Sequence, residues 1–360
     1  MIRIVLIVLL CSCVESKREH SPLTSEIAEE IILPPEDTSH VTPVKVAIFG
    51  DSGRGDTFRS TLNLIRAQGA EMVIHLGDLA YDEGNPDSPQ QWVNDINAVL
   101  GLKFPYFFLI GNHDVRYWFT SNGYNQIFID RLAQLRPNIC QVENGNKDHG
   151  IQSSCSYKEV FFALSGIGSY GEDSSHEAYL EKTLSDNADQ PWKICAWHKN
   201  RTDMQVGKKS DDVTWKAYQI CQKWGAMITT GHEHSYSRTR TLTKIGDQEL
   251  HHGVEGESDH VSLAPGKTFV VVSGIGGHSL RPYSCKDHDQ DDWWASIFSA
   301  NYQMKNGVIL RAKECSQNRE LHGMSGVLFV TFNFEGNPRL AKGVYLMTDG
   351  TVGDEFTLSR

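Results

Sequence analysis

Five separate apolar runs in this chain end in polar side chains of the kinds that bind metal ions. VKVAIFGD ends in Asp51, MVIHLGD in Asp78, YFFLIGN in Asn112 and KICAWH in His198, while MITTGHEH ends in His232 and His234. Apolar runs that alternate with segments of helical periodicity predict strands buried between helical layers. Because ligands bind at the carboxyl ends of the strands in open α/β sheets, we expect these six side chains to converge.

The segments between these runs have the spacing of amphipathic helices. The residues that share one helical face are Phe58, Leu62 and Ile65; then Trp92, Ile96 and Val99; then Phe128, Leu132 and Leu135; and finally Val213, Ala217, Ile220 and Trp224. Further buried strands are predicted within 157–166, 192–200, 225–234 and 267–278. The last forty residues predict antiparallel strands joined by Gly and Asn turns. The section 281–322 is predicted to be a loop-rich excursion over one edge of a single α/β domain, 44–360.

The first 13 residues predict an export signal, because one Arg precedes a short apolar run and small residues follow it. The run is too short to cross a bilayer as a helix. Leu10-Cys11-Ser12-Cys13 also resembles a bacterial lipobox, although Cys11 occupies a position where Ala, Ser or Thr is usual. A lipid on Cys13 therefore stays open, and residues 14–43 are predicted to be a linker. We expect an exported protein that is periplasmic, extracellular or lipid-anchored at the membrane surface.

The six remaining cysteines are consistent with an oxidising compartment. Cys140 and Cys155 flank a polar stretch, so a disulfide between them is the preferred pairing. Cys285 and Cys315 bracket another irregular region and could pair likewise. For Cys195, in an apolar strand, and Cys221, on a helix face, plain buried thiols are at least as good an interpretation.

The charge of the chain argues against a nucleic-acid partner. The formal net charge is −11, whereas phosphate backbones require clustered Lys and Arg. An acidic chain can still bind a phosphorylated substrate, because bound cations reverse the local field. The chain has 15 histidines, and neutral imidazole is the commonest metal ligand in proteins.

The ligand types narrow the choice of metal. Carboxylate, amide oxygen and imidazole without thiolate suit Fe, Mn or Zn, and one carboxylate can bridge two ions about 3.5–4 Å apart. Tyr81 lies three residues after Asp78. A phenol with an ordinary pKa of about 10 becomes a ligand only where a highly charged ion helps to deprotonate it, which favours iron(III). Alternatively, the Tyr81 hydroxyl merely caps its loop.

Five motifs in order resemble those of a known superfamily. DSG at 51–53, GDLAY at 77–81, GNHD at 111–114, AWH ending at His198 and GHEH at 231–234 look like the motif set of the calcineurin-like metallophosphoesterases, and more narrowly that of the purple acid phosphatase branch. The resemblance implies an α/β fold, a four-layer αββα sandwich of two mixed β-sheets flanked by helices. It also implies two metal ions bridged by Asp78. Asp51, Asp78, Tyr81 and His234 would hold Fe(III), and Asp78, Asn112, His198 and His232 would hold a divalent Fe, Mn or Zn.

Candidate catalytic and substrate-contacting residues lie beside these ligands. His113 is placed to donate a proton to a departing alkoxide or to stabilise charge on phosphoryl oxygens, and its alternative role is structural. Small mammalian-type members carry a further histidine downstream of the ligand at His198, and none is found here. Asn200, Arg201 or His278 could contact the substrate instead, although Arg201 could equally be a surface charge. Cys195 takes the first position of the VxxH motif.

The predicted function is dinuclear-metal-dependent hydrolysis of a small phosphoester by a purple acid phosphatase-like phosphomonoesterase. A phosphodiesterase or nucleotide hydrolase on the same metal pair is the alternative within enzymes. Other classes are a non-catalytic exported binding protein and a redox protein that uses an iron pair. The seven filled ligand positions favour an enzyme.

Overall fold

The computed structural model describes residues 41–360. The predicted export signal with Cys11 and Cys13, and the predicted linker up to residue 40, lie outside the described residues. No helix within the described part of the chain is both long enough and apolar enough to span a membrane.

Helices and strands alternate in the first part of the chain, whereas strands predominate after residue 230. The helices are α1 (Asp56–Ala67), α2 (Ser88–Leu100), α3 (Tyr124–Leu132), α4 (Asp173–Asp186), α5 (Trp215–Lys223) and α6 (Cys285–His288). The first strands are β1 (Val44–Phe49), β2 (Met72–His75), β3 (Tyr106–Phe108), β4 (Cys140–Val142), β5 (Gln152–Tyr157), β6 (Val160–Ser165), β7 (Trp192–Trp197), β8 (Met227–Thr230) and β9 (Tyr236–Thr239). The later strands are β10 (Leu242–Lys244), β11 (Glu249–Leu250), β12 (His260–Ser262), β13 (Val270–Ser273), β14 (Trp294–Phe298), β15 (Gln303–Lys305), β16 (Val308–Arg311), β17 (Gly326–Phe332), β18 (Leu340–Met347) and β19 (Val352–Ser359).

Within residues 41–360 the strands form two large mixed sheets. One has seven strands in the order β12-β19-β18-β17-β1-β2-β3, and the other has ten in the order β16-β15-β14-β9-β13-β8-β7-β6-β5-β4. The strands β1, β2 and β3 run parallel in the first sheet, as do β6, β7, β8 and β13 in the second. The parallel strands of each sheet therefore end side by side.

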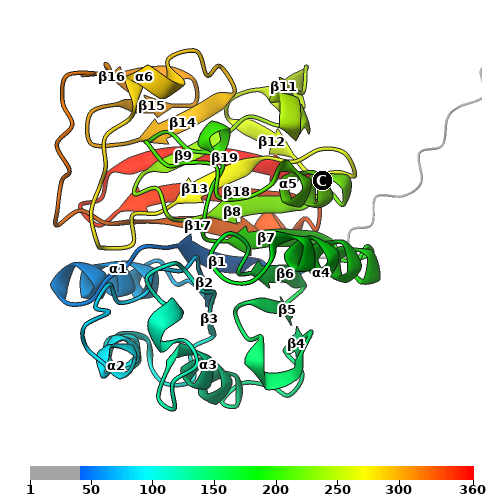
Figure 1. Ribbon diagram of the computed structural model, residues 1–360. Coiled ribbons are helices and arrows are strands. Elements are labelled where there is room, and N and C mark those ends of the chain that lie inside the picture. Colours follow the sequence, from blue (N-terminus) through cyan, green and yellow to red (C-terminus); the bar gives the residue numbers. More distant parts are fainter. Residues whose placement is uncertain (1–40) are drawn as a thin grey trace, which may run out of the picture. The chain divides into compact units, whose positions relative to one another are not determined.

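Helices cover the outer face of each sheet. α1, α2 and α3 pack on one another and on the first sheet, whereas α4 and α5 pack on the second (Figure 1). The largest core cluster contains side chains from both sheets, among them Ile48, Val271 and Leu328. The expected four-layer αββα sandwich is therefore confirmed.

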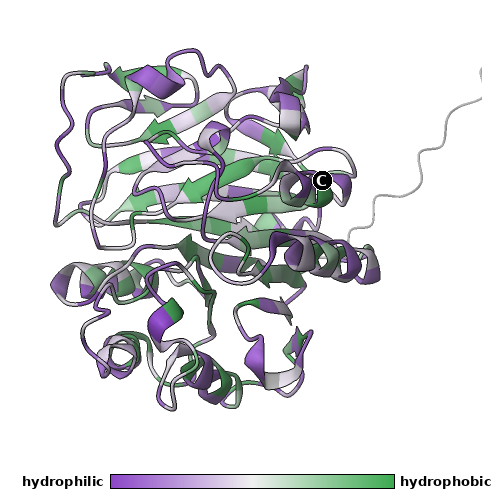
Figure 2. Cartoon of the chain, in the orientation of Figure 1, coloured by the Kyte–Doolittle hydropathy of each residue, from purple (hydrophilic) through white to green (hydrophobic). Residues whose placement is uncertain are grey.

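Burial on both faces explains the composition of the parallel strands. Every residue of β2, β3, β6 and β8 is buried, and Lys45 is the one partly exposed residue of β1. Such strands need continuous apolar runs instead of alternation. Helix α1 buries the predicted Phe58, Leu62 and Ile65. Figure 2 shows the apolar residues concentrated on the strands, with polar residues on the outer faces of the helices.

Three sequence expectations need correction. The section 281–322 is loop-rich at one edge, as expected, but it also contributes β14, β15 and β16, which were not predicted and which extend that edge of the ten-stranded sheet. Leu135 and Trp224 follow the last residues of α3 and α5. Helix α4 was not predicted at all, because its apolar residues are few and its burial rests partly on polar residues such as His176 and Glu177.

The described cysteines form three disulfides. The predicted pairs Cys140–Cys155 and Cys285–Cys315 are confirmed. Cys195 and Cys221 also form a disulfide, with their Cα atoms 6.4 Å apart, so the interpretation as plain thiols is wrong. Apolar periodicity indicates that both cysteines are buried, but only the docking of α5 over β7 brings them together.

A buried ion pair joins the two sheets. Arg238 on β9 and Asp354 on β19 have fully buried side chains, and Arg238 Nε donates to Asp354 Oδ2 over 2.6 Å. Tyr236 and Ser296 donate to the same carboxylate over 2.7 Å each. Removing one partner of such a pair leaves an uncompensated charge in the core.

We predict that Asp354→Asn lowers the free energy of unfolding by about 3–5 kcal/mol, because Arg238 then stays buried without a counter-charge. Urea denaturation followed by far-UV circular dichroism measures the change. The matched control is Asp186→Asn, which breaks the exposed pair with Lys182 and should leave the midpoint almost unchanged. Equal midpoints for the two variants would contradict the prediction.

Candidate metal centre

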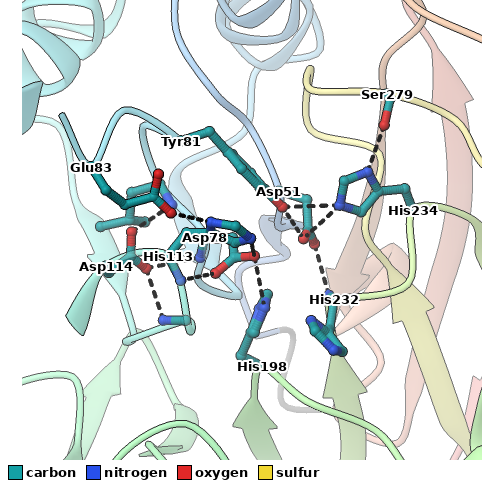
Figure 3. A network of polar contacts seen from close by, with 12 residues as sticks. Asp51, Asp78, Tyr81, Glu83, His113, Asp114, His198, His232, His234 and Ser279 are labelled. Carbon is teal, nitrogen blue, oxygen red and sulfur yellow. Dashed lines mark hydrogen bonds and ion pairs between the residues drawn. The ribbon is translucent and has the colours of Figure 1, made fainter. Parts of the chain in front are cut away.

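The predicted metal-binding side chains lie on the loops that follow five strands. Asp51 follows β1, Asp78 follows β2, Asn112 follows β3, His198 follows β7, and His232 and His234 follow β8. Parallel pairing brings these ends together: Asp51 N donates to Gly77 O over 3.0 Å, and the rings of His198 and His232 are 4.9 Å apart. Figure 3 shows the side chains of Asp51, Asp78, His198, His232 and His234 gathered at one place from both sheets.

Several of these turns have strained backbones. The φ angles of Asp51, Asp78, Tyr81 and His232 are 58°, 55°, 54° and 66°. A non-glycine residue in this left-handed region costs about 1–3 kcal/mol and persists only where its surroundings fix it. Gly111 permits the close approach of the next loop, since a Cβ there would lie 2.2 Å from Asp78 Oδ1. The local strain is consistent with turns that aim side chains into a shared site.

Asp51, Tyr81 and His234 form the first cluster. Tyr81 Oη donates to Asp51 Oδ1 over 2.7 Å and lies 2.9 Å from His234 Nε2, which is 3.2 Å from Asp51 Oδ1. Ligands at right angles around a cation, with bonds of about 2.1 Å, are about 3 Å apart. The three atoms therefore have the spacing of ligands that share one cation.

Asp78, Asn112, His198 and His232 form the second cluster. Side-chain atoms of Asp78, His198 and His232 all lie within 4.8 Å of one another, and His198 Nε2 is 3.1 Å from Asp78 Oδ2. Among the described residues, Asn112 Oδ1 and His232 Nδ1 are buried and have no hydrogen-bond partner. Buried polar atoms without a partner are rare in native proteins.

The hydrogen bonds of the two clusters fit a pair of cations. His198 Nδ1 lies 2.8 Å from Leu76 O, so it carries the proton and leaves the Nε2 lone pair toward Asp78. A lone pair facing a carboxylate is repulsive unless a proton or a metal ion lies between them. Carboxylate, amide oxygen, imidazole and phenol are suitable donors for such an ion. The residues present therefore fit a dinuclear site.

The electrostatics of the site favour positive charge. Burial alone would raise the pKa of Asp51, but His234 and His198 hold it well below its usual range. Burial opposes ionisation of Asp78 as well, yet His198 lowers its pKa to about 2. Burial lowers the pKa of His198, but Asp78 and Asp51 outweigh burial and raise it to about 9. The two carboxylates thus attract a cation into the space between the side chains.

The pKa shifts of His232 and Tyr81 both favour the neutral form of the side chain. Burial, with His198 and Lys209 nearby, lowers the pKa of His232 to about 2. Its imidazole is therefore neutral and available as a ligand. Burial together with Asp51 and Asp78 raises the pKa of Tyr81 well above its ordinary value. A phenolate at this position requires a strongly charged cation.

Residues that the sequence reasoning did not single out hold the ligands in place. His234 Nδ1 lies 2.7 Å from Ser279 Oγ, and Ser279 Oγ in turn donates to Glu320. Asp114 accepts hydrogen bonds from the backbone N–H groups of Asp78, Leu79 and Gly111 over 2.8–2.9 Å. The GNHD motif contains Asp114, but nothing near Ser279 or Glu320 in the sequence indicates their role. The role depends on the segments after β13 and before β17 meeting at His234.

His113 lies beside Asp78 at the edge of the site. Its backbone N–H donates to Asp78 Oδ1 over 3.0 Å, and its Nε2 is 3.9 Å from Asp78 Oδ2. The ring contacts that of Tyr81 at 4.6 Å, and Nδ1 pairs with Glu83. The side chain is 38% exposed, so it can reach a bound molecule.

The three candidates for substrate contact have different surroundings. His278 stacks on Tyr81 with ring centroids 3.9 Å apart and lies 5.4 Å from His234. The Arg201 guanidinium pairs with Asp211 over 2.7 Å and lies over the ring of Trp215. Asn200 is fully buried and donates to Thr230 Oγ1 over 2.6 Å. Of the three, His278 is the one in ring contact with the first cluster.

A polar cavity of about 450 Å³ opens beside Tyr81 and His278. Its other walls come from the loops after β1, β2 and β13 and from His322. Arg54 in this wall pairs with Asp82 over 2.7 Å. The cavity gives a small polar molecule access to the first cluster.

Comparisons with known proteins identify the sequence family. Residues 44–236, more than half of the chain, match the family described as Calcineurin-like phosphoesterase. No curated protein matches the chain.

Solved structures resemble the chain weakly. GAP50, the anchor in the inner membrane complex of Plasmodium, shares 11% identity over 88% of this chain and 89% of its own, with a TM-score of 0.48. A dimetal phosphatase from Danio rerio shares 9% identity over 88% of this chain and 98% of its own, with a TM-score of 0.45. PhoD shares 12% identity over 87% of this chain and 72% of its own, also with a TM-score of 0.45. The family assignment rests on the sequence match alone.

We predict that metal affinity rises with pH between pH 6 and pH 8 by about tenfold per unit. The pKa of His198 is raised to about 9, so the metal-free site holds a proton that an entering ion must displace. The same proton stabilises the metal-free fold fully below about pH 6.5, the ordinary pKa of histidine, and this stabilisation is lost as the pH rises through 9. Chelator competition with Mn²⁺ at pH 6, 7 and 8 measures the slope. An affinity independent of pH would contradict it.

Proposed function

The chain belongs to the calcineurin-like phosphoesterase family, and we propose that it is a purple acid phosphatase-like phosphomonoesterase. Members of the family are metal-dependent hydrolases of phosphoesters with a dinuclear centre, and small phosphoesters are their substrates. The finer assignment to a monoesterase of the purple acid phosphatase-like branch is the proposal.

The observation that supports the proposal most is the set of buried lone pairs without partners. In the proposed arrangement, Asp51, Asp78, Tyr81 and His234 hold one ion, and Asp78, Asn112, His198 and His232 hold the other. Asn112 Oδ1 and His232 Nδ1 lack any hydrogen-bond partner among the described residues, and leaving each of them buried and unpaired costs about 1–3 kcal/mol. Bound cations would remove this cost.

We further propose Fe(III) at the Tyr81 side and a divalent Fe, Mn or Zn at the His198 side. Burial and the two carboxylates raise the pKa of Tyr81, so a trivalent ion is the natural partner of its phenolate. Metal analysis with a visible absorption spectrum tests this assignment. A tyrosinate-to-iron(III) charge-transfer band supports it, whereas two zinc or manganese ions without such a band would exclude it.

When bound, the ions supply Lewis acidity toward a phosphoryl group and a nucleophile at neutral pH. The protein supplies orientation and a proton. His113 points its Nε2 toward the Asp78 side of the site, while Glu83 binds Nδ1 and fixes the ring. From this position it protonates the departing alkoxide. Ser279 and Glu320 orient His234 through its Nδ1, and His278 borders the cavity into which the leaving group extends.

We also propose that the protein is exported. The disulfides among the described residues suit an oxidising compartment, in keeping with the apolar start of the chain. The mature protein would be periplasmic, extracellular or anchored through a lipid on Cys13. Mass spectrometry of the N-terminus distinguishes an acylated Cys13 from an N-terminus that still carries Met1. An intact Met1 in the mature protein would contradict the removal of an export signal.

Activity should require the metal ligands and favour monoesters. We predict that Asp51→Asn and His232→Ala lose metal and turnover together, because each removes a proposed ligand. The measurements are metal content and kcat/KM for p-nitrophenyl phosphate and bis(p-nitrophenyl) phosphate. Faster turnover of the diester by the unmodified enzyme would point to a phosphodiesterase. Retained turnover in a folded, metal-free variant would exclude the proposed mechanism.

We predict that His113→Ala keeps both metal ions and lowers kcat by about 10²–10⁴-fold, which is the usual contribution of a positioned acid or base. The matched control is His260→Ala on β12, where the ring contacts Ser359. The control should keep full activity. An unchanged kcat in His113→Ala would remove its proposed role as the proton donor.

A further inference from the structure

The loop after β7 folds back over the segment that contains His232 and His234. Asp212 Oδ2 lies 3.7 Å from His232 Nε2. The Gly207 backbone lies directly against the buried Glu233 carboxyl group, because a Cβ at residue 207 would be 2.2 Å from Glu233 Cδ. Lys209 lies between these two contacts in the sequence. The loop therefore holds Lys209 next to the second metal cluster.

Hydrogen bonds fix the backbone of this loop. Gln205 Nε2 donates to the carbonyls of Thr202 and Lys209 over 3.1 and 3.4 Å. Gln205 Oε1 accepts from Gly207 N over 2.5 Å, and Gly207 O lies 2.9 Å from the His288 ring nitrogen Nε2. Because both ends of the 205–209 turn are tied, the Lys209 side chain starts from a fixed point.

The Lys209 ammonium group has no hydrogen bond or ion pair among the described residues, although its side chain is only partly exposed. Burial lowers its pKa and Arg281 lowers it further, while Glu233, Asp51 and Asp78 act in the opposite direction. The neighbouring contacts of Gly207 with Glu233 and of Asp212 with His232 place Lys209 beside the second cluster. A partly buried ammonium without a partner is costly.

Arg281 supplies a second cation at the same place. Its backbone N–H donates to His234 O over 2.7 Å, and its Nη1 donates to His232 O over 3.4 Å. Its Nε lies 3.4 Å from Glu320 Oε1. Glu233 is the acidic residue between the two histidines, but within the described structure it forms no ion pair with Lys209 or Arg281, and its Oε1 has no partner. An anion between the two like charges would relieve their repulsion.

We propose that Lys209 and Arg281 bind the non-bridging oxygens of the substrate phosphoryl group and thereby select a dianionic phosphomonoester over a monoanionic diester. The inference rests on the proposed function and names the residues that set its substrate class. Lysine acts on phosphate as a point charge, whereas the guanidinium presents a planar fork of donors. The extra negative charge of a monoester strengthens both interactions.

The test compares Lys209→Gln with Lys208→Gln, prepared as full chains with their metal ions. The control removes the same charge one residue away, where Lys208 is exposed and its Nζ donates to Asn318 over 3.2 Å. Lys209→Gln should lower kcat/KM for p-nitrophenyl phosphate by about 10- to 100-fold, as expected for one bond to a charged group. The value for bis(p-nitrophenyl) phosphate should fall by only about 3- to 10-fold, because the attraction of Lys209 to one negative charge is half its attraction to two.

Three further measurements separate binding from structure. Calorimetric titration with inorganic phosphate should show an affinity loss of similar size in Lys209→Gln only. Metal content should stay unchanged, and Lys209→Arg should restore most of the monoester activity.

Equal losses on both esters, unchanged phosphate affinity, or loss of metal in Lys209→Gln would each overturn the proposal. If the unmodified protein hydrolyses neither ester, the proposed function fails. The phosphate titration then still decides whether Lys209 binds the anion.

Discussion

The structure depends on a group of buried lone pairs that face one another. Asp78 Oδ2 and His198 Nε2 are 3.1 Å apart, and His198 Nδ1 is already bonded to Leu76 O. Without positive charge between them, the two acceptors repel in a site from which water is largely excluded. In the metal-free protein a proton on His198, whose pKa is raised to about 9, removes this repulsion, and an entering cation takes the place of that proton.

The two-sheet arrangement makes this geometry possible. The proposed ligands come from parallel strands of both sheets, whose ends are linked by backbone bonds such as Gly50 N to Ser273 O over 2.8 Å. The Arg238–Asp354 pair fixes β9 to β19 between the same sheets. Asp51 and His234 lie within four residues of the ends of β1 and β8, so a shift of one sheet against the other would move Asp51 relative to His234. Rigidity of the core is thus a condition for the spacing of the donors.

The chain as a whole is negatively charged, whereas the proposed site gathers positive charges. The whole chain is acidic, with a formal net charge of −11, and would repel a phosphoester. At the site the proposed cations and the pair Lys209 and Arg281 reverse that field locally. Close to a partly buried site such local charges act at short range and with little screening, so they outweigh the more distant surface carboxylates.

The sequence by itself determined the fold class and the candidate ligands. Continuous apolar runs such as 44–49 require burial on both faces. A side chain that can bind a metal ion follows each of these runs. Tertiary structure decided what no local pattern records. Examples are the disulfide between Cys195 and Cys221, the contact between His234 and Ser279 and the approach of Asp212 to His232. Each joins segments that are distant or irregular in sequence, and such contacts form only when helices and sheets dock. Periodicity reports which side of an element is buried, but not which neighbour it meets there.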